Sequence, residues 1–190
     1  MGSHFHPVGL QPQKHPKMHI YLKNRCPICG HEVMATSHGY KCKGCGLLIP
    51  QYIANRYITM SEAEDILAQK SVILDGFSNA DNTIFSAIPI IRNGKVETEK
   101  RIAACPFGQH GLIAVGTHKF YCTAHSYCII NCHFMLRRSY NGYRLTVDDV
   151  LNLLHNGQIS FVGFDKNDEL KEQIIVKSKF KFKPELKAVL

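Results

Sequence analysis

Four cysteines near the N-terminus have the residue type and spacing of a metal site. Two residues separate Cys26 from Cys29, two separate Cys42 from Cys45, and twelve lie between the pairs. Structural zinc takes four ligands in a tetrahedron, and a two-residue spacing lets one tight turn direct both sulfurs at the same ion. The pattern predicts a zinc ribbon. Because four thiolates leave no position for water, the Zn²⁺ is expected to be structural rather than catalytic.

Disulfides and redox chemistry are the alternatives for these cysteines. The chain has eight cysteines, but the N-terminus has no apolar segment typical of an export signal. Close pairs of thiolates also suit a metal better than a disulfide framework. No apolar run approaches the roughly 18–20 residues that a membrane span requires. We therefore expect a cytoplasmic protein with no membrane partner.

A second and less regular set of cysteines follows in the C-terminal half. The position that matches Cys29 is Gly108, and nine residues separate Cys122 from Cys132 where the first set has two. Cys128 or His125 could replace one ligand, and the alternative is a degenerate ribbon with buried cysteines. The predicted ligands of a second zinc are Cys105, His110, Cys122 and Cys132.

The chain repeats itself after a basic N-terminal segment. Ile58-Thr59 recurs as Leu145-Thr146 and Gly76-Phe77 as Gly163-Phe164, both 87 residues later. We expect an α+β fold of two tandem units, each a zinc ribbon followed by a helix and a small antiparallel sheet. The predicted organisation is a flexible basic arm over residues 1–24, a first unit over 25–103 and a degenerate second unit over 104–190.

Local patterns place the elements that follow each ribbon. Thr59 and Thr146 are predicted helix N-caps, each with an acid three residues later. Apolar residues then recur on one helical face. Asn93-Gly94 predicts a tight hairpin turn. The strands are expected over residues 72–77, 83–91, 159–164 and 173–182.

These motifs resemble a known family. The segments Cys26-Pro27-Ile28-Cys29-Gly30, Tyr40-Lys41-Cys42, Ile58-Thr59, Gly76-Phe77 and Phe85-Ser86-Ala87 resemble the C-terminal repeats of type IA DNA topoisomerases, most of all the topoisomerase III branch. The resemblance implies a surface that holds single-stranded DNA, and in some members contacts with proteins. The chain has no room for the catalytic core of that family, so the resemblance implies binding without strand cleavage.

Positive charge supports a nucleic-acid partner. The net charge is +8, and the excess lies in residues 1–25 and 105–190, whereas residues 26–104 are neutral. In residues 177–183 lysines alternate with other residues, which predicts a phosphate-tracking strand face or an edge strand protected by lysine. The predicted nucleic-acid contacts are Arg25, Tyr40, Lys41, Lys43, Arg56, Lys119, Tyr121, Arg137, Arg138, Lys177, Lys179, Lys181 and Lys183.

No pattern in the chain is typical of an enzyme. Phosphate-binding glycine loops, nucleophile elbows and zinc-protease motifs are missing from the sequence, and Asp148-Asp149 sits where acids favour a helix N-terminus. A nuclease using His125 or His133 is the best catalytic alternative. We expect a non-catalytic module that binds nucleic acid, with single-stranded DNA favoured and no small-molecule substrate. The runner-up is a protein–protein adaptor or scaffold subunit of a nucleoprotein complex.

Overall fold

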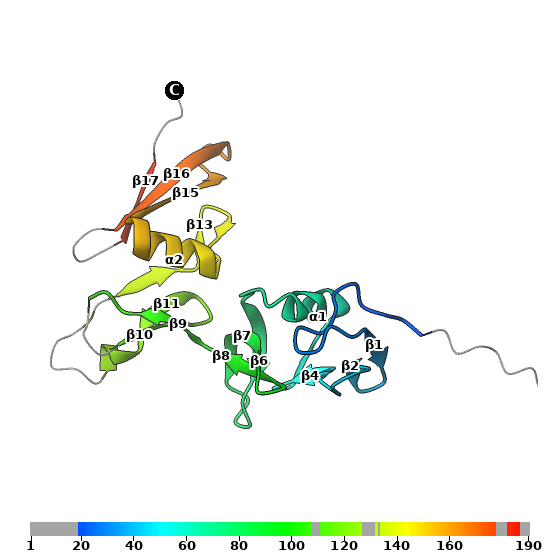
Figure 1. Cartoon of the computed structure of the whole chain (residues 1–190). Helices are drawn as coiled ribbons and strands as arrows, with labels where there is room; N and C mark the ends of the chain where they lie inside the picture. The colour runs from blue at the N-terminus through cyan, green and yellow to red at the C-terminus, as the bar shows by residue number, and fades with distance from the viewer. Residues whose placement is uncertain (1–18, 108–110, 127–131, 133, 178–181, 187–190) are drawn as a thin grey trace, which may run out of the picture.

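The computed structural model describes residues 19–107, 111–126, 132, 134–177 and 182–186. It is a mixed α+β structure of small antiparallel sheets and two helices (Figure 1). Its hydrophobic residues form two clusters, and the elements around them are termed the first and the second unit. In the described part of the chain, no helix has the length and apolar character needed to cross a membrane.

The first unit begins with a three-stranded ribbon sheet and ends with a second three-stranded sheet. A two-stranded hairpin and a helix connect them. The elements are β1 (Val33–Thr36), β2 (Gly39–Cys42), β3 (Leu48–Pro50), β4 (Tyr52–Ile53), β5 (Arg56–Tyr57), α1 (Met60–Leu67), β6 (Leu74–Ser78), β7 (Ile84–Arg92) and β8 (Lys95–Glu99).

The second unit has the same plan with one strand added to its ribbon sheet. That strand, β9, begins at Arg101, so the sheet of the second unit starts three residues before the predicted boundary at 104. The elements are β9 (Arg101–Ala104), β10 (Leu112–Val115), β11 (Lys119–Cys122), the 3₁₀ turn η1 (Thr123–Ser126), β12 (Met135–Arg137), β13 (Ser139–Tyr140), β14 (Tyr143–Arg144), α2 (Val147–Asn156), β15 (Gln158–Phe164), β16 (Leu170–Lys177) and β17 (Phe182–Leu186).

The elements of the two units recur at one spacing. The strands β3, β4 and β5 and the helix α1 each begin 87 residues before β12, β13, β14 and α2. The hairpin tip repeats as well, because Ala54 and Asn55 have positive φ angles and so do Asn141 and Gly142. The two units therefore correspond position by position over these elements.

Both helices begin at a capping box, as predicted. In α2 the Thr146 hydroxyl accepts a hydrogen bond from the Asp149 backbone N–H, and the Asp149 carboxylate accepts one from the Thr146 N–H. We expect Thr146→Ala to lower the free energy of unfolding by about 1 kcal/mol, because the helix then loses a cap. Urea denaturation measures this, with Thr146→Ser, which keeps the hydroxyl, as the control. Equal stability of the alanine and serine variants would contradict the assignment.

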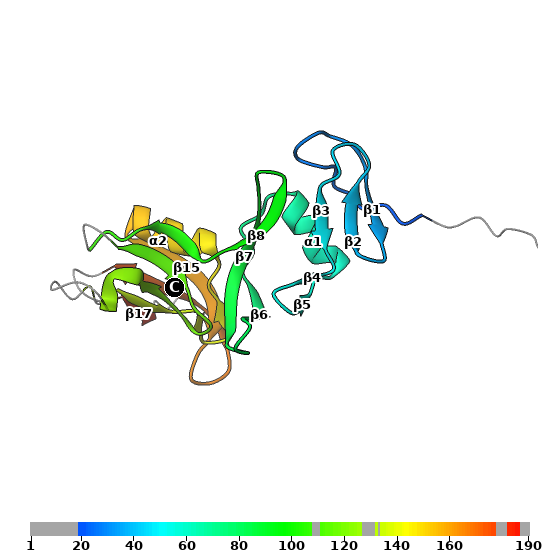
Figure 2. The ribbon, with the colours of Figure 1, turned by 90° about the horizontal axis from the view of Figure 1, so that it is seen from below.

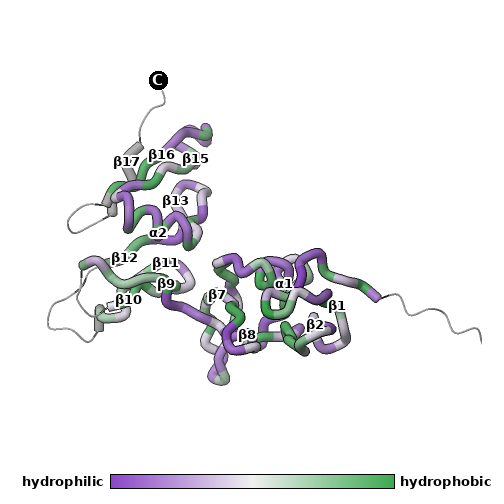
Figure 3. The backbone as a smooth tube through the Cα atoms, viewed as in Figure 1, coloured by the Kyte–Doolittle hydropathy of each residue, from purple (hydrophilic) through white to green (hydrophobic). Residues whose placement is uncertain are grey.

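The hydrophobic residues form one cluster in each unit, and β7 contributes to both. Ala87 belongs to the cluster of the first unit, whereas its neighbour Ile88 is buried in the cluster of the second. Ile73 and Ile90 also pack against the second cluster. Hydrophobic residues lie along β7, between the two units (Figure 3). The part of the outer face of the β6–β7–β8 sheet around Ile88 and Ile90 therefore packs against the second unit.

Two predicted boundaries are corrected by the structure. The predicted arm over residues 1–24 includes residues that belong to the first unit, because Tyr21 bridges to Met34 and Leu22 is buried there. The strand expected over 173–182 is in fact two strands of a hairpin, in which Lys177 of β16 pairs with Phe182 of β17. Lys177 and Lys183 thus lie on different strands and do not form one stripe. Lys179 and Lys181 lie outside the described residues.

Candidate metal centres and basic groove

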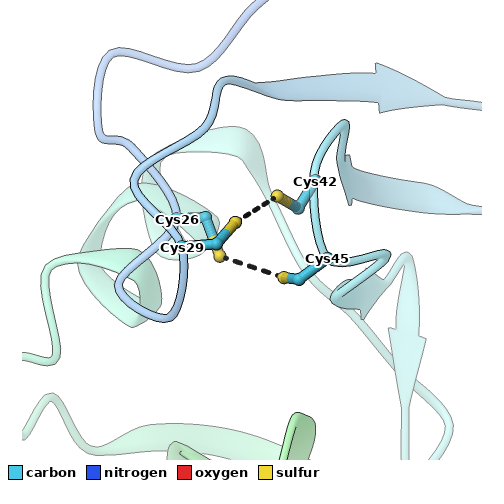
Figure 4. A group of neighbouring side chains, drawn as sticks. All are labelled: Cys26, Cys29, Cys42 and Cys45. Atoms are coloured by element: carbon cyan, nitrogen blue, oxygen red, sulfur yellow. Dashed lines mark hydrogen bonds between the residues drawn. The ribbon is translucent and has the colours of Figure 1, made fainter.

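The four cysteines of the first ribbon converge on one point. The Sγ atoms of Cys26 and Cys45 are 3.6 Å apart, those of Cys29 and Cys42 are 3.4 Å apart, and all four lie within 4.8 Å of one another (Figure 4). Four thiolates at about 2.3 Å from a tetrahedral ion have sulfurs about 3.8 Å apart. The first cluster, defined as these four cysteines, therefore has the dimensions of a site that could hold a metal ion.

Two backbone loops hold this cluster. In each loop a cysteine N–H donates to a carbonyl five residues later, Cys26 to His31 and Cys42 to Leu47. Gly30 and Gly46 take the positive φ angles of 72° and 76° that close these loops. The sequence therefore needs glycine at both positions, since most side chains disfavour this conformation.

The thiols of the first cluster differ in acidity. A hydrogen bond from the His31 backbone N–H lowers the pKa of Cys29 to about 6. Burial raises the pKa of Cys26 to about 12, since a thiolate there would be poorly solvated. Binding a metal therefore requires displacement of protons, and a bound cation would supply the charge that stabilises the thiolates.

A second cluster of three cysteines lies in the second unit. Cys105, Cys122 and Cys132 are all buried, with their sulfurs within 4.8 Å of one another. The Sγ atoms of Cys105 and Cys132 are 3.3 Å apart. Burial raises the pKa of Cys105 to about 12 and also raises the pKa of Cys122. Three sulfurs in this arrangement could also hold a metal ion.

The second cluster matches three of the four positions of the first. Cys132 lies 87 residues after Cys45, and the Cys105 N–H donates to the Gly111 carbonyl as the Cys26 N–H does to His31. The unmatched position is that of Cys29. The predicted fourth ligand, His110, and the alternative Cys128 lie outside the described residues. The backbone of His125 lies in η1, next to Cys122.

Two of the predicted nucleic-acid contacts have buried side chains. Tyr40 is 6% exposed, and its hydroxyl donates to the Ile58 carbonyl. The Arg138 side chain is 3% exposed and forms an ion pair with Asp75 at 2.7 Å. A third, Arg56, is half-buried and donates two hydrogen bonds to Glu62. None of the three presents a free cation or ring to a ligand.

The basic residues predicted near the first cluster are exposed, but most have partners. Arg25 donates to the Gly30 carbonyl. Lys43 pairs with Glu32 at 3.3 Å and lies over the Tyr21 ring, 4.4 Å from its centroid. Lys41 is exposed on β2. Among the described residues, Lys43 is therefore the one of these three cations with an acidic partner.

The basic residues predicted on the second ribbon lie on adjacent strands. Lys119 of β11 is directly opposite Arg137 of β12, and the next outward pair along the strands is Tyr121 and Met135. Lys119 and Arg137 are exposed, and neither has an acidic partner among the described residues. A groove of about 420 Å³, termed the basic groove, is lined by Thr117, His118, Lys119, Met135, Arg137, Arg138, Ser139 and Arg144.

Sequence reasoning missed the acid beside this groove. Asp75 of the first unit accepts hydrogen bonds from Arg138 and Arg144 of the second, 63 and 69 residues away. It neutralises the buried Arg138 and part of the charge of Arg144. No local pattern could have indicated this contact, since it joins residues of different units.

Comparison with protein-family models, curated proteins and solved structures found no match for this chain. The assignment of a function rests on the two cysteine clusters and the basic groove.

Proposed function

We propose that this chain is a non-catalytic module that binds zinc through the first cluster and single-stranded nucleic acid through the basic groove. Its motifs resemble topoisomerase C-terminal repeats, and single-stranded DNA is the ligand that this resemblance implies. Four cysteine sulfurs suit zinc better than a hard cation such as magnesium, which prefers oxygen ligands. The second cluster is proposed as a second zinc site, with His110 as the fourth ligand and Cys128 or His125 as its alternatives.

The observation that carries the binding proposal is the Lys119–Arg137 pair. Like charges directly opposite each other on neighbouring strands destabilise a sheet. The pair has no acidic partner in the described structure. Such an arrangement is expected where an anion from outside the chain, here a phosphate, supplies the opposite charge.

The neighbouring residues favour a single strand. Tyr121 is half-buried, with its ring against Gly116, and Met135 is 52% exposed. Aromatic side chains beside cations give bases a surface to stack on, at roughly 1–3 kcal/mol per base. A duplex offers only the edges of its stacked bases, so this surface suits unpaired bases.

The helices argue against insertion into the major groove of a duplex. Proteins that read the major groove commonly insert a helix whose residues contact bases and phosphates. Neither α1 nor α2 contains a lysine or arginine, and the first turn of α2 carries Asp148 and Asp149. Both helices would therefore repel a phosphate backbone.

Fluorescence anisotropy with labelled single-stranded DNA, single-stranded RNA and duplex DNA of equal length tests the proposal. We expect the single strands to bind most tightly. Lys119→Ala with Arg137→Ala should reduce the slope of log affinity against log salt by about 1.4, since each lost phosphate contact on a single strand contributes about 0.7.

The matched control is Lys95→Ala with Lys166→Ala, which removes the same charge from exposed positions outside the groove. This control variant should keep the salt slope of the wild type. No binding to any strand at low salt, or an equal reduction of the salt slope in both double variants, would contradict the proposal.

A further inference from the structure

A second cavity adjoins the basic groove where the two units meet. Figure 2 shows β6 and β7 between α1 and the elements of the second unit. The cavity, termed the joint pocket, has a volume of about 490 Å³. Pockets for small organic ligands commonly range over about 300–1,000 Å³. Residues 69–73, which follow α1, form its wall in the first unit, and Arg138, Arg144, Leu145, Thr146 and Asp148 form its wall in the second.

Two arginines belong to both cavities. Arg138 and Arg144 line the joint pocket and the basic groove, so the two cavities share a wall at these side chains. Asp75 accepts hydrogen bonds from both guanidinium groups and holds them in place. The Arg144 side chain nevertheless stays 55% exposed. A strand with its phosphates in the basic groove can therefore place an adjacent nucleotide at the joint pocket.

The charge of the joint pocket disfavours a phosphate inside it. Asp148 is exposed in the first turn of α2 and contributes a carboxylate to the wall. Lys70 contributes a cation, but it pairs with Asp65 at 2.7 Å. A carboxylate repels a phosphate, and it accepts hydrogen bonds from the N–H groups of bases. The joint pocket therefore suits a neutral group with polar hydrogens better than a second phosphate.

The remaining wall combines apolar and polar side chains. Val72, Ile73 and Leu145 offer aliphatic surface, whereas Gln69 and Ser71 add an amide and a hydroxyl. An amide both donates and accepts hydrogen bonds. Ligand pockets are commonly lined by apolar surface with a few polar groups that fix the orientation of the ligand. An unpaired base, which has flat apolar faces and an edge of donors and acceptors, matches this lining.

Two features of the wall cost free energy in the chain on its own. Gln69 follows the C-cap of α1 and has a φ of 55°, in the left-handed region that glycine commonly occupies at the end of a helix. The buried Nε atom of Arg138 has no hydrogen-bond partner among the described residues, and an acceptor on a ligand would supply one. Both features are expected where a ligand, rather than the fold, uses these side chains.

We propose that the joint pocket receives one unpaired base of the single strand whose phosphates lie in the basic groove. The inference rests on the proposed function and extends it, because the base lies at the junction of the units and the phosphates lie on the second ribbon. Gln69 of the first unit and Asp148 of the second contact the edge of the base, and Val72 contacts its face. A bound strand thus contacts both units.

Anisotropy with two labelled strands of equal length, one of deoxythymidines and one of abasic analogues, tests this proposal on the zinc-loaded chain. Both strands carry the same phosphates, so the difference in affinity measures the contribution of the bases. Gln69→Gly should weaken binding of the thymidine strand about fivefold and leave the abasic strand unchanged, since glycine fits the left-handed backbone and only the amide is lost.

Asn82→Gly is the matched control, because Asn82 is exposed, has a φ of 61° and lies outside both cavities. This variant should bind both strands like the wild type. The Lys119→Ala with Arg137→Ala chain reports on the proposed function separately, since it should lower the salt slope for both strands.

Photo-cross-linking from strands with one 4-thiothymidine, placed at each position in turn, needs no variant of the protein. Peptides that contain residues 69–73 should carry a cross-link in addition to peptides of the basic groove. Cross-links confined to β11 and β12, or a Gln69→Gly chain that binds the thymidine strand as tightly as the wild type, would overturn the assignment of the joint pocket and leave that of the basic groove intact.

Discussion

Replacing Cys42 with serine is expected to unfold the first ribbon and abolish one zinc per chain. Cys42 is 2% exposed and belongs both to the first cysteine cluster and to the hydrophobic core of the first unit. Structural zinc in small domains contributes apparent binding energies of about 10–16 kcal/mol to folding. That exceeds what a ribbon of short strands can gain from its own core, so loss of the ion should unfold it.

Zinc content by atomic emission and the dispersion of amide NMR signals measure this effect. Cys45 provides the matched control because it is exposed and has room for a larger ligand. Cys45→His should keep the ion, since zinc accepts imidazole, whereas Cys45→Ser should lose it. A Cys42→Ser chain with unchanged zinc content and an unchanged spectrum would refute the assignment of the first cluster as a structural zinc site.

Replacing Asp75 with alanine is expected to lower the free energy of unfolding by about 3 kcal/mol. The change leaves the Arg138 guanidinium, 3% exposed, without its ionic partner, and the Nε atom of Arg138 already has no hydrogen-bond partner among the described residues. Removing one member of a buried ion pair typically costs about 3–5 kcal/mol, and the lower figure applies because Asp75 remains 35% exposed. Urea denaturation at neutral pH measures the loss.

The double variant Asp75→Ala with Arg138→Met is the control for this prediction. It removes both charges and keeps much of the volume of the arginine side chain, so it should be more stable than Asp75→Ala alone. Equal stability of Asp75→Ala and the wild type would show that the ion pair contributes nothing to the free energy of unfolding.

The ionisation of Asp75 also determines how its contribution to the free energy of unfolding changes in acid. Burial raises the pKa of Asp75, but hydrogen bonds from Ser86 and Arg138 outweigh it, so the folded pKa lies below its usual value. The stabilisation that ionised Asp75 gives the folded chain is therefore fully present above the unfolded pKa, about 3.9, and is lost as the pH falls through the folded pKa. Below about pH 4 the gap in stability between wild type and Asp75→Ala should narrow. Loss of metal affects both chains and cancels in the comparison.

Local sequence patterns predicted the elements well because those elements depend on neighbouring residues. Thr59 and Thr146 begin the two helices, and the residues expected on their apolar faces, such as Ile66 and Leu153, are buried. Asn93 and Gly94 form the turn between β7 and β8 with positive φ angles. The spacing of Cys26, Cys29, Cys42 and Cys45 likewise located a cluster in which sequence separation is short.

Contacts between the units could not be predicted in this way. Arg138 has the charge of a phosphate contact, and only its pairing with Asp75 across the unit boundary shows that it is buried. The run of apolar residues in β7 predicts a buried strand, but not that alternate residues enter different cores. The division of this segment into β16 and β17 was missed because the lysines continue a regular two-residue alternation from Lys177 to Lys183.

The strand β7 contributes to the hydrophobic cores of both units and so couples the folding of the two units that hold the cysteine clusters. Because Ala87 and Ile88 lie in different cores, unfolding of the first unit removes part of the core that holds the second cluster in place. Linkage is reciprocal, so under the proposed zinc binding an ion at either cluster would strengthen binding at the other by the same factor. We therefore expect depletion of zinc to release both ions over a narrower range than two independent sites would.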